Sequence, residues 1–381
     1  MLIINAEIVT MEAEGILHNA WLQVTGKKLA ALGFMAEGTP KDDEIIDIQG
    51  ASVYPGFIDA HTHLGMWENG LAFEGDDGNE DTDPSTPHLR AIDAVNFFDE
   101  CFAEAARAGV TTIVTGPGSA NPIGGQLAVY KTFGNPEEQL VEPYLALKLA
   151  LGENPKSTYH GKGETPVTRM ATAAIIREQL LKASRYLQDL EENEELPELD
   201  VKCEALIPVL KKEKPVHIHC HRRDDILTAI RIAEEFGLDY VLVHATEGYM
   251  IADYLKGKGA KILSGPLLCD RSKPELKNLS PSSVGVLFEA GVQSAIISDH
   301  PVIPIQYLPL SAGIAVREGL PHESALAAIT SVPAAICGLS ERIGSIKLGK
   351  DADFSVFSGD PLSISATPQM VFVSGKRVNA L

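Results

Sequence analysis

The sequence predicts a (β/α)₈ barrel joined to a small β-sandwich that both ends of the chain build together. Short apolar runs alternate with helical patterns through the middle of the chain, and short apolar stretches between turn residues fill both ends. The 381 residues suffice for a barrel of about 250 residues and an accessory unit. We therefore expect residues 1–52 to form the first part of the sandwich, residues 53–344 the barrel and residues 345–381 the second part of the sandwich.

Each end of the chain has the pattern of a small antiparallel unit. The apolar stretches of the N-terminal end, with glycines between several of them, are residues 2–9, 17–24, 28–33 and 44–48. Residues 352–357 and 370–373 repeat this pattern near the C-terminal end, and a tight turn at residues 374–376 follows. Two half-sheets so far apart in sequence can pair only if the chain between them folds back to its start.

Eight apolar runs in the middle of the chain are the candidate barrel strands. They are residues 53–58, 110–115, 126–131, 144–151, 216–219, 240–243, 260–263 and 292–297. Helical patterns fall between many of them, for example at residues 91–108, 166–190, 225–236 and 248–256. Eight buried strands separated by helices fit a closed barrel better than an open doubly wound sheet.

The net charge and the hydropathy of the sequence limit the kinds of molecule that the protein is expected to bind. The chain has 32 Lys and Arg residues against 52 Asp and Glu residues, so its net charge is −20 with neutral histidine. Such a field repels phosphate backbones and anionic lipid, which argues against nucleic acid and membrane surfaces as partners. The N-terminus lacks the pattern of a secretory signal, and no stretch reaches the roughly 18 apolar residues of a membrane span. We expect a cytoplasmic protein with a small-molecule substrate.

His61 and His63 lie where the first barrel strand should end. Residues two apart on a strand point to the same face, so both imidazoles can bind one metal ion. The spacing alone is weak evidence. Its position strengthens it, because barrel active sites are built at the carboxyl ends of the strands.

The same position is polar again on three later strands. His219 and His244 each end an apolar run, and Asp299 follows the last run. Because the carboxyl ends of barrel strands meet at one mouth, we expect these side chains to converge with the histidine pair. Neutral imidazole and carboxylate suit Zn²⁺, Fe²⁺ or Mn²⁺, and mixed sites with an open position are catalytic.

These segments resemble the amidohydrolase superfamily of metal-dependent hydrolases, and the imidazolonepropionase-like branch is the most similar. The matching segments are residues 55–63 (Pro-Gly-Phe-Ile-Asp-Ala-His-Thr-His), 109–112 (Gly-Val-Thr-Thr) and 344–353, so the resemblance spans nearly the whole chain. The resemblance implies a homodimer and one or two divalent metals, Zn²⁺ before Fe²⁺ or Mn²⁺. The residues to which it assigns the metal are His61, His63, His219, His244 and Asp299.

The expected chemistry follows from those ligands. A divalent metal lowers the pKa of a bound water from about 15.7 towards 7 and polarises the carbonyl group under attack. We expect Asp299 to take the proton of that water and later deliver it to the leaving nitrogen, and we count His244 with it as catalytic.

A second metal needs a bridging group from a middle strand, and two residues qualify. Lys148 resembles the family lysine that becomes carboxylated. Glu153, at the end of the same strand, resembles the direct glutamate ligand of the deacetylase branch. The sequence leaves both open.

Three histidines follow one another on the fifth strand. His217, His219 and His221 share one face by parity. We expect His219 to be the metal ligand, because the similar branches place theirs just before a small residue and an acid. His221 stands where that acid is expected, which leaves its role open, and His217 is expected to pack in the interior.

Three residues are candidates for binding the substrate. Arg222 opens the helix after His219 and can bind a substrate carboxylate through a bidentate pair. Gln126 ends the Gly- and Pro-rich segment after the second strand, which can wall the pocket. Trp67 lies just beyond the histidine pair and can line the mouth.

Together these residues predict a hydrolase that cleaves a carbon–nitrogen bond in a cyclic amide or another amide of a small metabolite. A deaminase acting on a ring is one alternative. A dipeptidase or N-acyl amino acid hydrolase is another, favoured if Lys148 is carboxylated and two metals bind. A non-catalytic barrel scaffold is the remote alternative, because all the expected ligand positions are filled.

Overall fold

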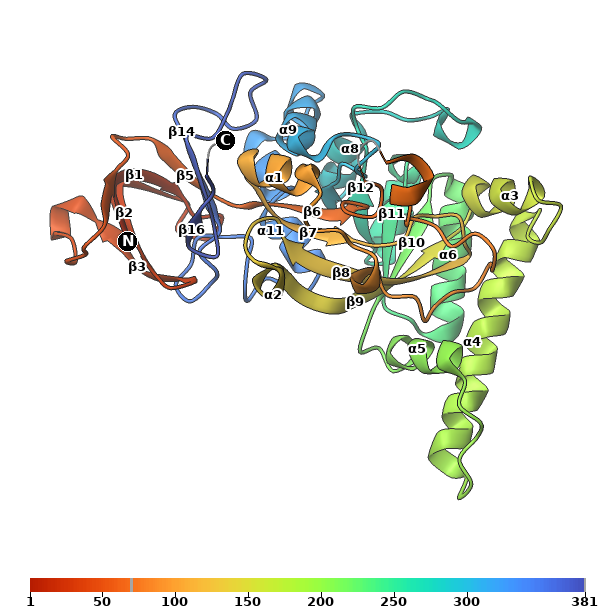
Figure 1. The fold of residues 1–381 in the computed structure, drawn as a ribbon. Coiled ribbons are helices and arrows are strands. Elements are labelled where there is room, and N and C mark those ends of the chain that lie inside the picture. Colours follow the sequence, from red (N-terminus) through yellow and green to blue (C-terminus); the bar gives the residue numbers. More distant parts are fainter. Residues whose placement is uncertain (69–70, 380–381) are drawn as a thin grey trace.

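The computed structural model describes residues 1–68 and 71–379, which form two sheets with helices around the larger one (Figure 1). The larger sheet has eight strands in the order β13-β12-β11-β10-β9-β8-β7-β6. These strands are β6 (Phe57–Thr62), β7 (Val110–Thr115), β8 (Ile123–Lys131), β9 (Leu140–Ala150), β10 (Val216–Cys220), β11 (Tyr240–His244), β12 (Lys261–Ser264) and β13 (Gln293–Ile296). Asp59 Oδ2 of β6 accepts a hydrogen bond of 3.1 Å from the backbone N–H of Ser298, just beyond β13, so the sheet nearly closes into a barrel.

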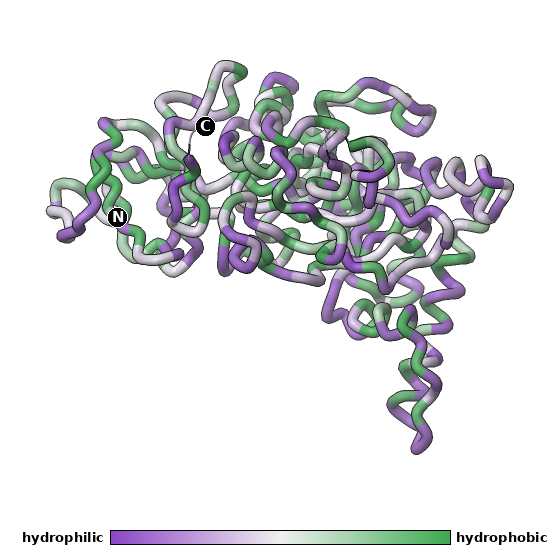
Figure 2. Tube along the Cα trace, in the orientation of Figure 1, coloured by the Kyte–Doolittle hydropathy of each residue, from purple (hydrophilic) through white to green (hydrophobic). Residues whose placement is uncertain are grey.

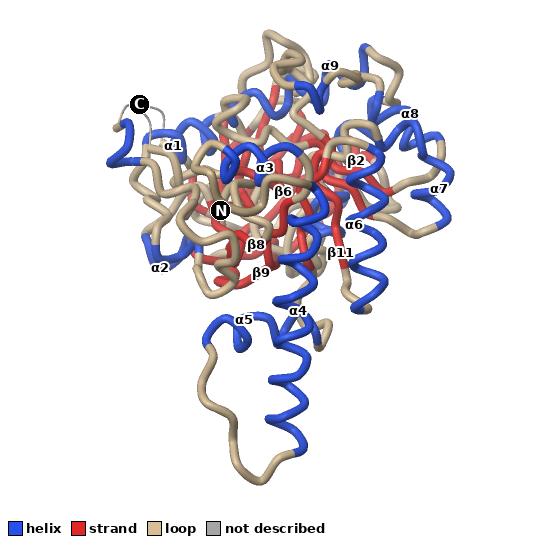
Figure 3. Tube along the Cα trace, turned by 90° about the vertical axis from the view of Figure 1, so that its right-hand side faces the viewer, coloured by secondary structure: helices blue, strands red, loops and turns tan. Residues whose placement is uncertain are grey.

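Helices follow most of the barrel strands. They are α1 (Glu100–Arg107), α2 (Pro136–Gln139), α3 (Glu153–His160), α4 (Arg169–Glu192), α5 (Val201–Leu210), α6 (Arg223–Phe236), α7 (Ala252–Gly257), α8 (Ser283–Glu289), α9 (Leu308–Arg317), α10 (His322–Ala327) and α11 (Ser331–Ile336). The helix expected at residues 91–108 begins only at Glu100, because the Asp99 side chain accepts from the Cys101 N–H and caps it there. Figure 3 shows α4 projecting from the body of the molecule, with α5 beside it.

The third barrel strand corrects the expected all-parallel barrel. β8 pairs antiparallel with both β7 and β9, whereas the other described pairs of the barrel are parallel. Only residues 116–122 join β7 to β8, and parallel pairing needs a crossover of about a dozen residues or more. Because β8 runs backwards, it carries Lys131 to the amino-terminal end of the barrel, where the buried ammonium group contacts Asp353 and lies 3.2 Å from Asp351.

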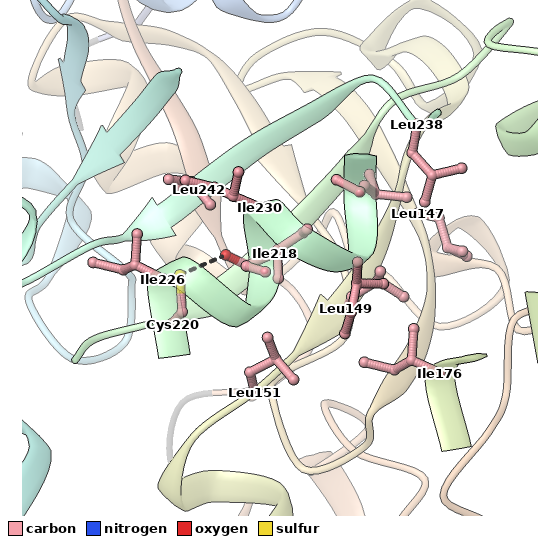
Figure 4. Close-up of a cluster of buried hydrophobic side chains, with 14 of the residues drawn as sticks. Leu147, Leu149, Leu151, Ile176, Ile218, Cys220, Ile226, Ile230, Leu238 and Leu242 are labelled. Carbon is pink, nitrogen blue, oxygen red and sulfur yellow. Dashed lines mark hydrogen bonds between the residues drawn. The ribbon is translucent and has the colours of Figure 1, made fainter. Parts of the chain in front are cut away.

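Alternation along β9 and β10 decides which side chains enter the barrel. Leu149, Ile218 and Cys220 belong to a buried cluster that packs against α4 and α6 on the outer face of the sheet (Figure 4). Successive side chains of a strand point to opposite faces. Lys148 and His219, the neighbours of these residues, therefore point into the barrel, and both are buried.

The strand expected at residues 53–58 is divided at Gly56 into two strands that serve different sheets. β5 (Ser52–Pro55) belongs to the smaller sheet and β6 to the barrel. A Cβ atom at Gly56 would lie 2.1 Å from the hydroxyl oxygen of Thr111, so only glycine leaves room for the Thr111 side chain against the backbone here.

The smaller sheet joins both ends of the chain. Its order is β16-β15-β14-β5-β1-β2-β3, with β4 beside β1. The further strands are β1 (Leu2–Val9), β2 (Ile16–Thr25), β3 (Lys28–Phe34), β4 (Ile45–Asp47), β14 (Phe354–Phe357), β15 (Met370–Val373) and β16 (Lys376–Arg377). A Cβ atom at Gly375 would meet the carbonyl oxygen of Gly26 at 2.2 Å, so the hairpins at the two edges approach each other. The shared sheet is thus present, and its division into the two facing layers of a sandwich stays a prediction.

Hydropathy follows this architecture. Figure 2 shows hydrophilic segments at the free end of α4 and hydrophobic segments along the strands of the barrel. In the part of the chain that the structure describes, no helix is long and apolar enough to cross a bilayer.

Candidate metal centre

Two histidines and an aspartate meet where β6 and β13 end. Asp299 Oδ1 lies 3.4 Å from His61 Nε2 and 3.5 Å from His63 Nε2. His244, the last residue of β11, approaches them, and the ligand atoms of His61, His244 and Asp299 all lie within 4.8 Å of one another. The side chains expected to bind metal from three separate strands therefore converge.

Two of these residues have an unusual backbone conformation. His244 has φ of 68° and Asp299 has φ of 56°, in the left-handed region that non-glycine residues seldom adopt. Such a conformation costs on the order of 1–3 kcal/mol and persists only where the surrounding structure enforces it, often at functional sites.

A second group of imidazoles adjoins the first. The ligand atoms of His219, His221 and His244 lie within 4.8 Å of one another. The His221 ring stacks on the His244 ring at a centroid distance of 4.6 Å and an angle of 17°, and the His219 and His221 ring centroids are 4.7 Å apart. His221, whose role the sequence leaves open, therefore lies within the cluster.

The charge states of these groups suit a cation. Burial lowers the pKa of His61, His219 and His221 well below its usual value and that of His244 to about 4, so the imidazoles are neutral at pH 7. Burial opposes ionisation of Asp299, but its histidine neighbours, His244 first, hold the pKa of this carboxyl well below its usual range. Neutral imidazole and carboxylate are the forms that bind divalent metals.

Backbone carbonyl groups orient two of the imidazoles. His63 Nδ1 donates to Gly116 O and His244 Nδ1 donates to Gly265 O, each at 2.7 Å. Such bonds fix the tautomer and leave Nε2 free to bind metal. Among the described residues, the buried Nδ1 atoms of His61 and His219 have no hydrogen-bond partner. A set of buried, neutral, partly unpaired imidazoles beside an ionised carboxylate fits a divalent cation such as Zn²⁺.

Lys148 and Glu153, the two candidate bridging residues, are separated by the structure. Lys148 is wholly buried with its Nζ 3.2 Å from His61 Nε2, and burial lowers the pKa of this amine to about 7. Glu153 begins α3, and its carboxylate accepts from the Glu275 N–H at 3.3 Å. The geometry therefore places Lys148, and not Glu153, at the candidate metal centre.

A cavity of about 520 Å³ opens above the histidine cluster. Trp67 lines it with its ring 4.8 Å from the His63 ring, edge to face. Lys273 lines it as well, and its Nζ lies 2.8 Å from Asn154 Oδ1 and 2.7 Å from Glu275 Oε1. Sequence reasoning missed Lys273, because it lies in an irregular loop after β12 where periodicity carries no information.

Two of the expected substrate contacts lie elsewhere. Arg222 caps α6, pairs with Asp224 at 2.7 Å and is half exposed, outside the described lining of the cavity. Gln126 lies on β8 and its Nε2 donates to Pro87 O at 3.4 Å, also outside that lining. Arg222 forms an ion pair with the nearby Asp224 and so does not reach the cavity. The register of β8 places Gln126 opposite Leu147, and its side chain points away from the barrel mouth.

His217 packs in the barrel interior, as expected. It is wholly buried, and neither ring nitrogen has a hydrogen-bond partner among the described residues. Burial lowers the pKa of His217 to about 3, so the ring is neutral.

The fold is that of a barrel protein, and the histidines and Asp299 form a candidate metal centre at the barrel mouth. Residues 52–378 match the model of the amidohydrolase family. The chain therefore belongs to the amidohydrolase family, a family of hydrolases that act on carbon–nitrogen bonds.

Individual relatives agree with this assignment. The crystal structure of an amidohydrolase from Thermotoga maritima MSB8 matches with a TM-score of 0.95 and 41% identity over 99% of both chains. Amidohydrolase tasK of Hapsidospora irregularis is 31% identical over 369 residues, 89% of this chain, and the chain spans only 38% of that protein. An imidazolonepropionase of Micrococcus luteus is 35% identical over 72 residues, 19% of this chain and 16% of that protein.

Proposed function

We propose that the protein is a metal-dependent amidohydrolase that hydrolyses an amide carbon–nitrogen bond in a small metabolite bearing an anionic group. The observation that carries the proposal is the convergence of His61, His63 and Asp299 at the barrel mouth, with the Lys148 amine against His61. The acidic net charge of −20 favours a small-molecule substrate over a polyanion, and we propose a cytoplasmic location.

His61, His63 and Asp299 would hold one divalent metal, and His219 and His244 a second, with Zn²⁺ before Fe²⁺ or Mn²⁺. When bound, such a metal supplies a Lewis acid for the carbonyl group and a water whose pKa falls from about 15.7 towards 7. Lys148, whose amine is partly neutral near pH 7, is the candidate for carboxylation.

Asp299 performs the proton transfers. Its carboxylate is ionised and lies at the floor of the cavity, so it can accept a proton from the attacking water and return it to the leaving nitrogen. A positioned acid and base of this kind contributes about 10²–10⁴ in rate. Trp67 forms a wall beside His63 and limits the water that reaches the reacting bond.

Lys273 supports an anionic substrate. Its ammonium group is 28% exposed and reaches the cavity that holds Asp299. A lysine ammonium has three donors, so contacts to Asn154 and Glu275 leave one for a substrate carboxylate. This takes the role that the sequence assigned to Arg222.

A dipeptide or an N-acyl amino acid is the second candidate substrate class. The position of Lys148 at the centre favours it, because a bridging carboxylated lysine belongs with two metals. Such substrates also carry the carboxylate that Lys273 would bind.

The test is a substrate panel with zinc-loaded protein. We expect turnover of cyclic amides, N-acyl amino acids or dipeptides, detected as a new amine or carboxylate, with loss in Asp299→Asn. Release of ammonia from ring amidines, with no turnover of amides, would replace the proposal with a deaminase. A metal-loaded protein inactive on both classes would favour the scaffold alternative.

A further inference from the structure

We propose that His221 is a metal ligand, and that His219, His221 and His244 form a three-imidazole position for a second divalent cation. This inference rests on the proposed metal-dependent function, and it assigns a residue that the family pattern leaves without a role.

The geometry of the three rings carries the inference. Their ligand atoms lie within 4.8 Å of one another, so one cation can reach all three with small adjustments. The rings belong to β10, to the residue after it and to β11, and the backbone of neighbouring strands therefore fixes their spacing. All three side chains are at least nine-tenths buried, and all three line the cavity.

One ring nitrogen of His221 is occupied and the other is available. Nδ1 lies 2.7 Å from the hydroxyl oxygen of Thr246, a contact that fixes the orientation of the ring. Nε2 is left for the cation. The buried Glu275 Oε1 atom lies 3.6 Å from Nε2, and it is already paired with the Lys273 ammonium group at 2.7 Å, so it leaves Nε2 without a hydrogen-bond donor to compete with a cation.

The number of ligands also favours this assignment. Catalytic zinc sites generally have three protein ligands and an open position. His61, His63 and Asp299 supply three ligands for one cation. Without His221 the second position has only two imidazoles, His219 and His244, and His244 also lies within reach of His61 and Asp299. His221 supplies this position with a third imidazole whether or not Lys148 is carboxylated.

His217 is the matched control on the same strand. Like His221 it is buried and neutral, and it lies two residues from His219 on the other side. It differs in lying outside the described lining of the cavity and outside the three-imidazole group. A general effect of removing a buried imidazole would therefore appear in both variants, and a ligand effect only in His221.

The experiment measures zinc per chain and zinc affinity by chelator competition in the parent protein and in His221→Ala, His217→Ala and His61→Ala. We expect two zinc ions in the parent and in His217→Ala. In His221→Ala we expect one zinc ion, because the affinity of the position formed by His219 and His244 should fall at least about tenfold. The zinc ion held by His61, His63 and Asp299 should be lost only in His61→Ala. His221→Asn, with Co²⁺ absorption as the readout, replaces the alanine variant if that variant fails to fold, and its spectrum should change where that of His217→Asn does not.

Two results would overturn the inference in different ways. Unchanged stoichiometry, affinity and cobalt spectrum in the His221 variants would remove His221 from the ligands and leave the proposed function standing. A parent protein that binds no divalent metal would remove both.

Discussion

The Lys148 amine lies 3.2 Å from His61 Nε2, and both side chains are wholly buried. Two nitrogen bases thus face each other inside the barrel, where burial lowers the pKa of the amine to about 7 and that of the imidazole well below its usual value. Lys148 thus contacts the same ring nitrogen of His61 that faces Asp299. Glu153, at the start of α3, has no such contact among the described residues.

Replacing Lys148 should weaken the metal position that contains His61. In Lys148→Met we expect about a tenfold or greater loss of zinc affinity at that position, because the variant removes the side chain proposed for carboxylation beside the ligand atom of His61, and even a partner outside the ligand set typically contributes 10–100-fold. Chelator competition measures the loss. Glu153→Ala is the control and should bind zinc as the parent does; the reverse pattern would make Glu153 the relevant residue.

Asp299→Asn should abolish most of the activity and leave the fold intact. Asparagine tolerates the left-handed conformation that Asp299 adopts at φ of 56°, so the backbone needs no rearrangement. We expect kcat to fall by about 10²–10⁴, the usual contribution of a positioned acid and base. Steady-state kinetics with thermal unfolding as the folding control checks this. A variant that keeps its kcat would exclude Asp299 from proton transfer.

Lys273→Met should raise KM for an anionic substrate. A hydrogen bond to a charged group is worth about 1.5–3 kcal/mol, so KM should rise roughly 10–100-fold, with less effect on a neutral analogue of the same substrate. Arg222→Met removes a cation that is paired with Asp224 outside the cavity, and its KM should not change. Equal effects of Lys273→Met on charged and neutral substrates would show that Lys273 has only a structural role, through Glu275.

The stability of the junction between the two sheets should depend on pH through Asp351. Lys28 and Arg342 lie 2.8 and 2.9 Å from this buried carboxylate, and Lys131 lies 3.2 Å from it. Burial raises the pKa of Asp351, but these cations, Lys131 first, hold it below its ordinary value of 3.8. The ionised group therefore stabilises the fold above pH 3.8, and this contribution is lost as the pH falls through the lower, folded-state pKa.

Asp351→Asn tests this pH dependence. We expect a loss of about 2 kcal/mol in the free energy of unfolding at pH 7, and a smaller loss as the pH approaches 3. Denaturant unfolding at several pH values measures the difference. A loss of the same size at every pH would show that the carboxylate charge contributes nothing.

The positions of the strands could be predicted because buried strands appear in the sequence as short runs of apolar residues. The runs at residues 110–115 and 216–219 became strands with almost the same bounds, and both ends of the chain joined in one sheet. The direction of β8 could not be inferred from its own residues, because an apolar run has the same pattern in either direction. Only the short connection at residues 116–122 carries that information.

The candidate site was predictable where a strand end positions a residue and unpredictable where a loop does. His61, His244 and Asp299 meet because each lies near the end of a barrel strand or follows one. The position of Lys273 depends on the path of an irregular loop, and the displacement of Arg222 depends on an ion pair with a nearby acid. Neither leaves a periodic signal in the sequence.

Because β5 pairs with β14, the smaller sheet cannot be completed during synthesis until β14 has been made. Val53 of β5 lies opposite Val356 of β14, so one edge of β5 stays unpaired until β14 leaves the ribosome. An exposed strand edge is a template for pairing with other chains. A translation product that stops after Asp299 but before β14 would therefore carry all the candidate metal ligands together with an open edge next to Gly56, and would be prone to aggregate.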